Sequence, residues 1–235
     1  MALPTDSNDT FLREVDENLR RDQLQDFLKK NGTWIALAIV LLLGAAGGWI
    51  YWEQHQKKQS AEQSEQLHAI FNDIAQNKQQ TVPERLQKLE QANGDVVRAS
   101  AVLTDAALAL EKNNRSAAVA KYRELANDKG LPQLYRDVGT IRLTALEFDT
   151  IKPEEVIARL EPMAKTGNPW FGSAGEMTAL ALLKQGKKAE AGKLFAQIAA
   201  DNQVPNSIRT RAVQVAGTLG VDASASLPGL QQQQD

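Results

Sequence analysis

The chain of 235 residues contains no cysteine. This absence excludes disulfide scaffolds, iron–sulfur clusters, zinc sites built on thiolates and catalysis by a thiol. Aromatic residues make up only 6% of the chain, which is few for a protein with large ligand pockets. A net charge of −2 and a pI of about 5.8 leave no concentrated basic surface, so we expect no binding to nucleic acid.

The sequence also lacks the motifs of known catalytic and cofactor sites. It has no Gly-x-Gly-x-x-Gly, Walker loop, Gly-x-Ser-x-Gly or His-Glu-x-x-His. Its two histidines, His55 and His68, are thirteen residues apart and share no helix face suited to a metal ion. Glu154 and Glu155 directly follow Pro153, where negative charge favours a helix N-terminus. We therefore predict no catalytic residue, no cofactor, no metal site and no enzymatic activity.

Alternating Val, Ile and Thr runs bounded by turn residues are absent as well, so we expect an all-α protein. Residues 31–52 form an uncharged, mostly apolar run with Trp34 near one end and Trp49 and Trp52 at the other. About 20 helical residues cross the roughly 30 Å hydrocarbon layer, and aromatic residues concentrate at its interfaces. We predict a single transmembrane helix rather than a buried core helix. A cleaved signal peptide is the main alternative, but the long patterned segment before the run favours an uncleaved anchor.

The orientation of this helix follows from the nearby basic residues. Four precede the run and two follow it closely: Arg20, Arg21, Lys29 and Lys30 before it, and Lys57 and Lys58 after it. The rule that positive charge stays inside predicts a cytoplasmic N-terminus and, in a bacterial inner membrane, a periplasmic C-terminal domain. Gly44 and Gly48 form a Gly-x-x-x-Gly step, which we take either as a contact with another transmembrane helix or as a chance spacing.

We divide the chain into five segments by composition and periodicity. The expected segments are a cytoplasmic tail at 1–30, the transmembrane helix at 31–52, a helical stalk at 53–80, a helical repeat domain at 81–220 and a disordered Gln-rich tail at 221–235. The first segment carries a short amphipathic helix, which either binds a partner or lies on the membrane surface. The stalk ends in an apolar stripe that should dock onto the repeat domain: Leu67, Ile70, Phe71 and Ile74.

An internal repeat dominates the remaining sequence. Residues 118–136 align with residues 191–209 without a gap, at an offset of 73 positions. Pro132, Pro169 and Pro205 mark the starts of successive units, because proline costs no hydrogen bond in the first turn of a helix. The spacing predicts three antiparallel helical hairpins and a final capping helix. We expect the hairpins near 96–128, 132–165 and 169–201, and the last helix at 205–217.

The third hairpin supplies a candidate peptide-binding groove. We expect the stripe of Trp170, Ala174, Met177 and Ala181 to pack against the helix that carries Phe195. That packing would turn five other residues toward a neighbour or the concave surface: Ser173, Glu176, Leu180, Leu183 and Lys184.

Two acidic and basic pairs repeat across the same offset, Asp128 with Arg136 and Asp201 with Arg209. We prefer to interpret each as an ion pair across a turn between hairpins. The alternative is a ladder of arginines for an acidic peptide.

The spacing Gly186-x4-Ala191-x3-Phe195 resembles the tetratricopeptide repeat, in which a turn glycine, a small residue and an aromatic residue follow at these intervals. The order of charged helix, Asn31-Gly32, membrane run, Gly48-Trp49-Ile50-Tyr51-Trp52, Gln-rich stalk and repeats resembles the YfgM-like ancillary SecYEG translocon subunits. That resemblance implies a single-pass inner-membrane protein without catalytic residues. It also implies two partners, the Sec translocon and a membrane-anchored periplasmic chaperone of the prolyl-isomerase type.

These observations lead to one hypothesis and one alternative. The hypothesis is a membrane-tethered periplasmic scaffold whose helical hairpin solenoid binds segments of the translocon, of a chaperone or of exported proteins. The alternative is a structural factor for cell-envelope assembly that acts through oligomerisation.

Overall fold

A computed structural model describes the backbone of residues 7–226, and side chains from Lys29 onward apart from Ile35 and Ala38. The amphipathic face expected before the membrane run therefore lies outside the described side chains, as do residues 227–235 of the expected tail. The chain divides into two compact units, Met1–Ala61 and Glu62–Asp235.

The first unit contains the greater part of α1 (Ser7–Ala75), including the apolar run. Among the described residues, α1 is the one helix long and apolar enough to cross a membrane, with a mean hydropathy of 2.0 in its most apolar window. No part of that window is buried, and Trp34 keeps 71% of its surface exposed. A core helix of a soluble protein would bury such side chains, so the exposure fits contact with lipid.

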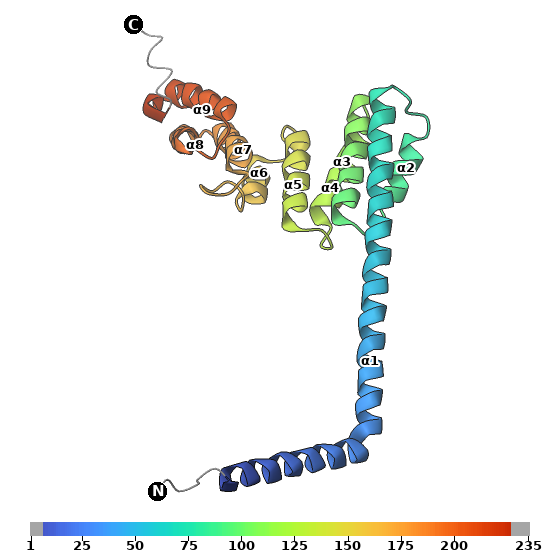
Figure 1. The fold of residues 1–235 in the computed structure, drawn as a ribbon. Helices are drawn as coiled ribbons and strands as arrows, with labels where there is room; N and C mark the ends of the chain where they lie inside the picture. The colour runs from blue at the N-terminus through green and yellow to red at the C-terminus, as the bar shows by residue number, and fades with distance from the viewer. Residues whose placement is uncertain (1–6, 227–235) are drawn as a thin grey trace, which may run out of the picture. The chain divides into compact units, whose positions relative to one another are not determined.

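The second unit is a stack of helical hairpins in chain order (Figure 1). After the end of α1 come eight α-helices and a short 3-10 helix: α2 (Val82–Leu89), α3 (Asp95–Glu111), α4 (Arg115–Asn127), α5 (Gln133–Glu147), α6 (Pro153–Leu160), α7 (Phe171–Lys184), α8 (Lys188–Ala200), α9 (Asn206–Thr218) and η1 (Ser224–Ser226). No strand occurs between residues 7 and 226. The all-α prediction is confirmed, and the three predicted hairpins correspond to α3–α4, α5–α6 and α7–α8.

The 73-residue offset relates two groups of three helices. Helix α4 begins and ends 73 residues before α8, and α5 begins 73 residues before α9. We call α3–α4–α5 the first triplet and α7–α8–α9 the second triplet. In each triplet the third helix packs against the second. Helix α6 has no equivalent helix in the second half of the repeat, because the positions 73 residues after α6 lie beyond the end of α9.

The end of α1 belongs to the core of the second unit. Leu67 and Ile70 pack with Val82 and Leu86 of α2 and with Val97 of α3. The apolar stripe predicted for the end of the stalk therefore docks as expected through these two residues and through Ile74, which is partly buried against the same core. Phe71, the remaining residue of the stripe, does not dock, since 43% of its surface remains exposed.

An ionic cluster joins α2, α3 and α4. The Lys121 ammonium lies 2.6 Å from Glu90 and 3.1 Å from Asp105. Burial, together with the negative charges of Asp105 and Glu124, raises the pKa of Glu90, although the Lys121 ammonium acts to lower it. Burial acts to lower the pKa of Lys121, but its hydrogen bonds to Glu90 and Asp105 and the negative charges of these two residues together raise that pKa. The cluster holds its lysine charged and disfavours the charge on Glu90.

The predicted packing of α7 is wrong in one respect. The stripe of Trp170, Ala174, Met177 and Ala181 lies against α6 and α5, in a cluster with Val156, Leu160 and Met163. Helix α7 meets α8 through other residues, among them Phe171 and Ala179, which pack with Phe195. Helical spacing identifies an apolar stripe, but α7 has neighbours on two sides and both of its stripes are buried.

The packed part of the chain extends past Gly220, where we expected the repeat domain to end. Val221 and Ala223 contact the core of the second triplet. The guanidinium of Arg209 then donates a hydrogen bond of 2.6 Å to the carbonyl oxygen of Ser226.

Candidate peptide-binding groove

Helix α7 positions the five residues of the predicted groove. It buries one side against α6 through Ala174 and Ala181, and another against α8 through Phe171 and Ala179. The five predicted residues do not behave alike on the sides that remain. Leu180 keeps 38% of its surface exposed, Ser173 and Glu176 are half-buried, and Leu183 packs against the core of the second triplet.

Glu176 is already paired with a cation of α9. The Arg211 guanidinium donates one hydrogen bond to each oxygen of the Glu176 carboxylate, from Nη2 to Oε2 at 2.7 Å and from Nε to Oε1. This hydrogen bonding raises the pKa of Arg211. A two-point arginine–carboxylate contact fixes orientation as well as distance, so this pair links α7 to α9.

Lys184 is paired with the turn after α5. Its ammonium lies 2.8 Å from Asp149 Oδ1 and 4.3 Å from the centre of the Phe148 ring. The hydrogen bond from Lys184 lowers the pKa of the exposed Asp149 carboxyl. Both charged members of the predicted groove therefore have partners within the protein. Leu180 lies between them along α7 as an exposed apolar residue.

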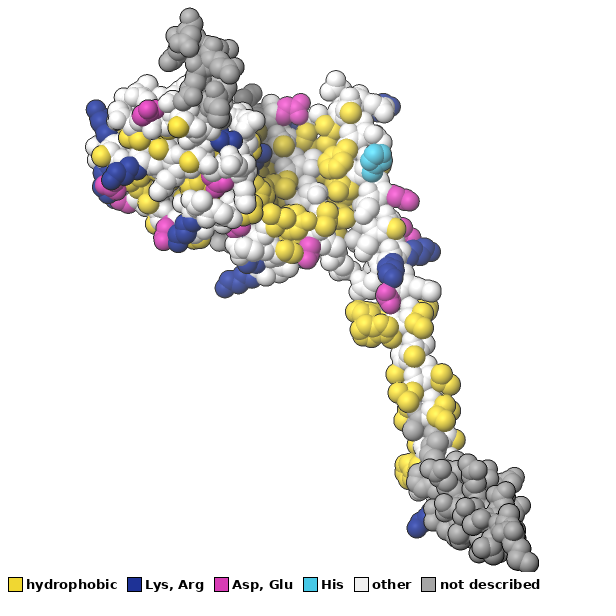
Figure 2. Space-filling model, turned by 60° about the vertical axis from the view of Figure 1, so that its left-hand side comes forward, with side chains coloured by type: hydrophobic (Ala, Val, Ile, Leu, Met, Phe, Trp, Pro, Cys, Tyr) yellow, Lys and Arg dark blue, Asp and Glu magenta, His cyan; other side chains and the backbone are white. Residues whose placement is uncertain are grey.

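Sequence reasoning missed three exposed apolar residues on earlier helices. Phe71, Val96 and Leu134 expose 43%, 62% and 55% of their surfaces, and they lie on α1, α3 and α5. With Leu180, the end of α1 and the first helix of each hairpin carry one exposed large apolar side chain. Figure 2 shows hydrophobic side chains gathered in a hollow of the repeat domain. The sequence does contain a signal for these residues, because the apolar stripes of the helices are broader than one neighbouring helix can cover.

The repeated Asp and Arg residues do not form the predicted ion pairs. The carboxylates of Asp128 and Asp201 accept hydrogen bonds from the amides two residues ahead in their own turns. Arg136 donates to the carbonyl of Leu131, and Arg209 donates to that of Ala199. Short acidic side chains satisfy local turn amides, while arginine is long enough to reach a carbonyl of the turn, as at Leu131, or of the last turn of a helix, as at Ala199. Both pairs therefore stabilise turns, and neither forms an ion pair between hairpins.

Three of the remaining candidates for chemistry, His55, Glu154 and Glu155, have structural partners. His55 shares a hydrogen bond with Gln59 four residues later on α1. In the first turn of α6, Glu154 accepts from Gln185 and Glu155 accepts from Arg159. No cluster of metal-binding side chains is found among the residues whose side chains are described.

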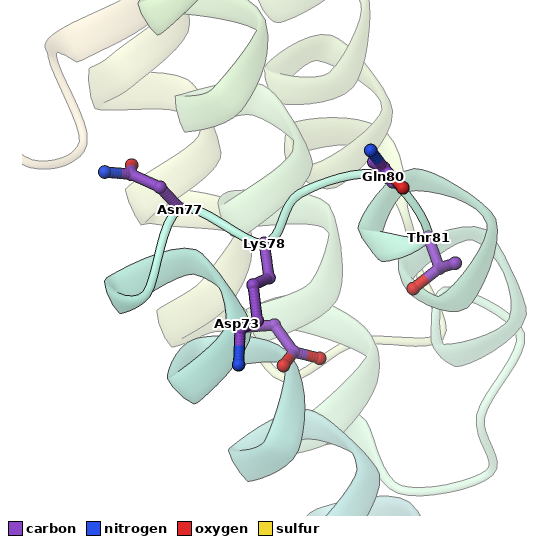
Figure 3. A pocket seen from close by; sticks show the side chains of 5 residues that line it. All are labelled: Asp73, Asn77, Lys78, Gln80 and Thr81. Carbon is purple, nitrogen blue, oxygen red and sulfur yellow. The ribbon is translucent and has the colours of Figure 1, made fainter.

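Two further features of the surface bear on binding. Nothing lies within 4 Å of a side-chain carbon built at Gly44 or Gly48, so their side of α1 is open to a neighbour, and that contact stays a prediction. A pocket of about 450 Å3 lies at the turn after α1, where the Asn77 side chain points away from those of Gln80 and Thr81 (Figure 3). Polar groups that diverge in this way do not define a binding site.

Comparison with known proteins gives one family and two relatives. The family described as "Tetratricopeptide repeat-like domain" matches residues 25–216. A protein of Haemophilus influenzae named "Ancillary SecYEG translocon subunit" is 28% identical over 184 residues, which are 78% of this chain and 88% of that protein. A protein of Escherichia coli K12 with the same name is 24% identical over 172 residues, 73% of this chain and 82% of that protein. No solved structure matches the chain. The resemblance expected from the order of segments is confirmed.

Proposed function

The chain belongs to the tetratricopeptide repeat-like domain family, and on that premise we propose that it is a non-catalytic scaffold at the Sec translocon of a bacterial inner membrane. The apolar run of α1 anchors it, the N-terminus is cytoplasmic and the repeat domain is periplasmic. The basic residues before the run outnumber those after it, which supports this orientation. The names of the two relatives support the place of action.

We propose that the groove on α7 binds segments of exported proteins, of translocon subunits or of a membrane-anchored periplasmic chaperone. The observation that carries this proposal is Leu180, exposed between the Glu176–Arg211 and Lys184–Asp149 ion pairs. An apolar side chain flanked by charges of both signs suits a segment with one apolar edge. The anchor confines the groove to the membrane plane and raises the effective concentration of any partner held at the same translocon.

Site-directed crosslinking in intact membranes tests this function. A photoreactive residue placed at Leu180 should crosslink to translocon subunits, to a chaperone or to a chain in export. The same residue at Lys193, exposed on α8 and outside the groove, should not. Copurification of translocon subunits after mild solubilisation provides the second measurement. Crosslinks found only between copies of this chain would reject the proposal in favour of the oligomerising assembly factor.

A further inference from the structure

The turn between α2 and α3 places an asparagine directly before a glycine, Asn93 and Gly94. The chain has one other such pair, Asn31 and Gly32, which lies within α1. An asparagine–glycine pair is chemically labile, because glycine has no Cβ to keep its backbone nitrogen away from the preceding side chain. The two pairs share this dipeptide and differ in the structure around it.

The fold leaves both groups that can react in the turn unrestrained. The side chain of Asn93 is exposed and makes no hydrogen bond to any described residue. The backbone N–H of Gly94 donates no hydrogen bond within the described part of the chain either, because Gly94 stands at the N-terminus of α3, where amides have no partner in the helix. The carbonyl oxygen of Gly94, by contrast, accepts from the amide of Arg98 at 2.9 Å. The side chain and the nitrogen that must meet are therefore both free.

The second pair lies in the opposite environment. Asn31 and Gly32 are interior residues of α1, so the amide of Gly32 belongs to the hydrogen-bonded backbone of a helix. Reaction would require this amide nitrogen to turn toward the preceding side chain, and that movement breaks the local helix. Asn31–Gly32 therefore serves as a comparison within the same molecule, with the same dipeptide held in a protected backbone.

The fold does not require glycine at position 94. Its backbone has a φ of −83° and a ψ of 118°, values that residues with a side chain also adopt. A side-chain carbon built at Gly94 would meet nothing closer than Cγ2 of Val97, at 3.9 Å. Alanine therefore fits at this position, and the substitution Gly94→Ala can change the chemistry of the pair without changing the turn.

We propose that Asn93 is a site of spontaneous deamidation through a succinimide formed with Gly94. The Gly94 nitrogen loses its proton and bonds to Cγ of Asn93, the bond from Cγ to Nδ2 breaks, and the Nδ2 group leaves with that proton as ammonia. Water then opens the ring at either carbonyl carbon, which gives an aspartate or an isoaspartate. Water is the only co-reactant, and the exposed Asn93 side chain is in contact with it. The proposal is independent of the role at the translocon and of the groove on α7.

The isoaspartate product changes the place where the end of α1 docks. It inserts an additional carbon atom into the backbone between Ala92 and Val97, which keep only 4% and 5% of their surfaces exposed. Both belong to the core that also holds Leu67 and Ile70 of α1. Two buried residues so close in the chain leave little freedom for a longer backbone, so the isoaspartate should loosen this core.

The test follows the full chain in detergent during incubation at mildly alkaline pH. Peptide mapping by mass spectrometry measures the exchange of NH2 for OH at each asparagine, and labelling with an isoaspartate methyltransferase identifies the isoaspartate. Deamidation at Asn93 should be at least about tenfold faster than at Asn31, because each 1.4 kcal/mol needed to open α1 locally slows the reaction about tenfold. Synthetic peptides of residues 89–98 and 27–36, which are too short to hold a stable helix, should react at similar rates.

Two variants complete the test. Gly94→Ala should slow deamidation at Asn93 several-fold while thermal melting stays within a few degrees of the parent chain. The matched control Gly32→Ala, at a position with nothing within 4 Å of the added carbon, should leave the rate at Asn93 unchanged. The isoaspartate form, separated by ion exchange, should melt below the unmodified chain, and equal melting would overturn the predicted effect on the core. An Asn93 that reacts in its peptide but not in the folded chain, equal rates at Asn93 and Asn31 in the folded chain, or an unchanged rate in Gly94→Ala would each overturn the proposal.

Discussion

The substitution Leu180→Asp separates a binding surface from a packing surface on α7. Leu180 keeps 38% of its surface exposed, whereas Phe195 of α8 keeps 1% and packs within the core of the second triplet. Replacing a partly exposed residue changes little buried area, so we expect Leu180→Asp to cost about 1 kcal/mol or less. Emptying a core site by Phe195→Ala typically costs about 3–5 kcal/mol, because a cavity remains.

These costs translate into melting temperatures that are easy to tell apart. For a domain of this size each kcal/mol corresponds to about 2–4 °C, so Phe195→Ala should lower the melting temperature by about 6–20 °C. Leu180→Asp should lower it by about 4 °C or less. Thermal unfolding of the full chain in detergent, followed by far-ultraviolet circular dichroism, measures both.

The binding assay completes the comparison. In intact membranes Leu180→Asp should reduce crosslinking to partners from a photoreactive residue at Ser173, since it places a charge where the partner's apolar edge should lie. Glu176→Lys should do the same through reversal of charge. If Leu180→Asp unfolds the domain as readily as Phe195→Ala, Leu180 belongs to the packing between hairpins. The reasoning would then be refuted, and the groove would have to lie on another face.

Three further predictions concern the anchor and the ionic cluster. A reporter active only in the periplasm should be active when fused after Asp235 and inactive when fused before Met1; the reverse would overturn the orientation. Protein purified from membranes should retain residues 1–52 by mass spectrometry, whereas a new N-terminus near Gly47 would reveal a signal peptide. Lys121→Met should cost about 1–3 kcal/mol in urea unfolding at neutral pH, because Glu90 loses its donor. The pKa of Glu90 is raised in the folded protein, so folding takes up a proton at Glu90 and acidification favours the folded state. The destabilisation caused by Lys121→Met should therefore become smaller at mildly acidic pH, where Glu90 is protonated. A destabilisation that does not change with pH would contradict this role of the Lys121–Glu90 pair.

The sequence predicts the helices well because their ends have local causes. Pro132, Pro169 and Pro205 each stand within two residues of the first residue of a helix, and Asn113 and Gly186 adopt the positive φ angles that end helices before short turns. These signals depend on neighbouring residues alone. The short helix α2 was not predicted, since its 8 residues, about two helical turns, give an apolar spacing too brief to stand out.

The rotation of each helix about its axis could not be predicted in the same way. Periodicity identifies Trp170, Ala174, Met177 and Ala181 as one stripe, but the choice between α6 and α8 as its neighbour depends on contacts made across the stack. For the same reason Leu134, placed by its spacing on the apolar stripe of α5, is 55% exposed. The ion pairs of the groove residues Lys184 and Glu176 could not be predicted either, because their partners Asp149 and Arg211 lie 35 positions away along the chain.

One position explains why the first triplet continues into α6 while the second triplet ends. Glu147 and Gly220 are equivalent across the 73-residue offset. At Gly220 the backbone takes a φ of +81°, a left-handed conformation that costs other residues about 1–2 kcal/mol. The chain can therefore reverse there, and Val221 and Ala223 cover the core that a further helix would otherwise cover. Glu147 instead is the last residue of α5, and its carboxylate, with 13% of the side chain exposed, accepts hydrogen bonds from Arg123 and Arg159.

A solenoid needs such a closing element, because the last repeat would otherwise expose its apolar side. The first triplet is instead followed by α6, which packs against α5 and α7.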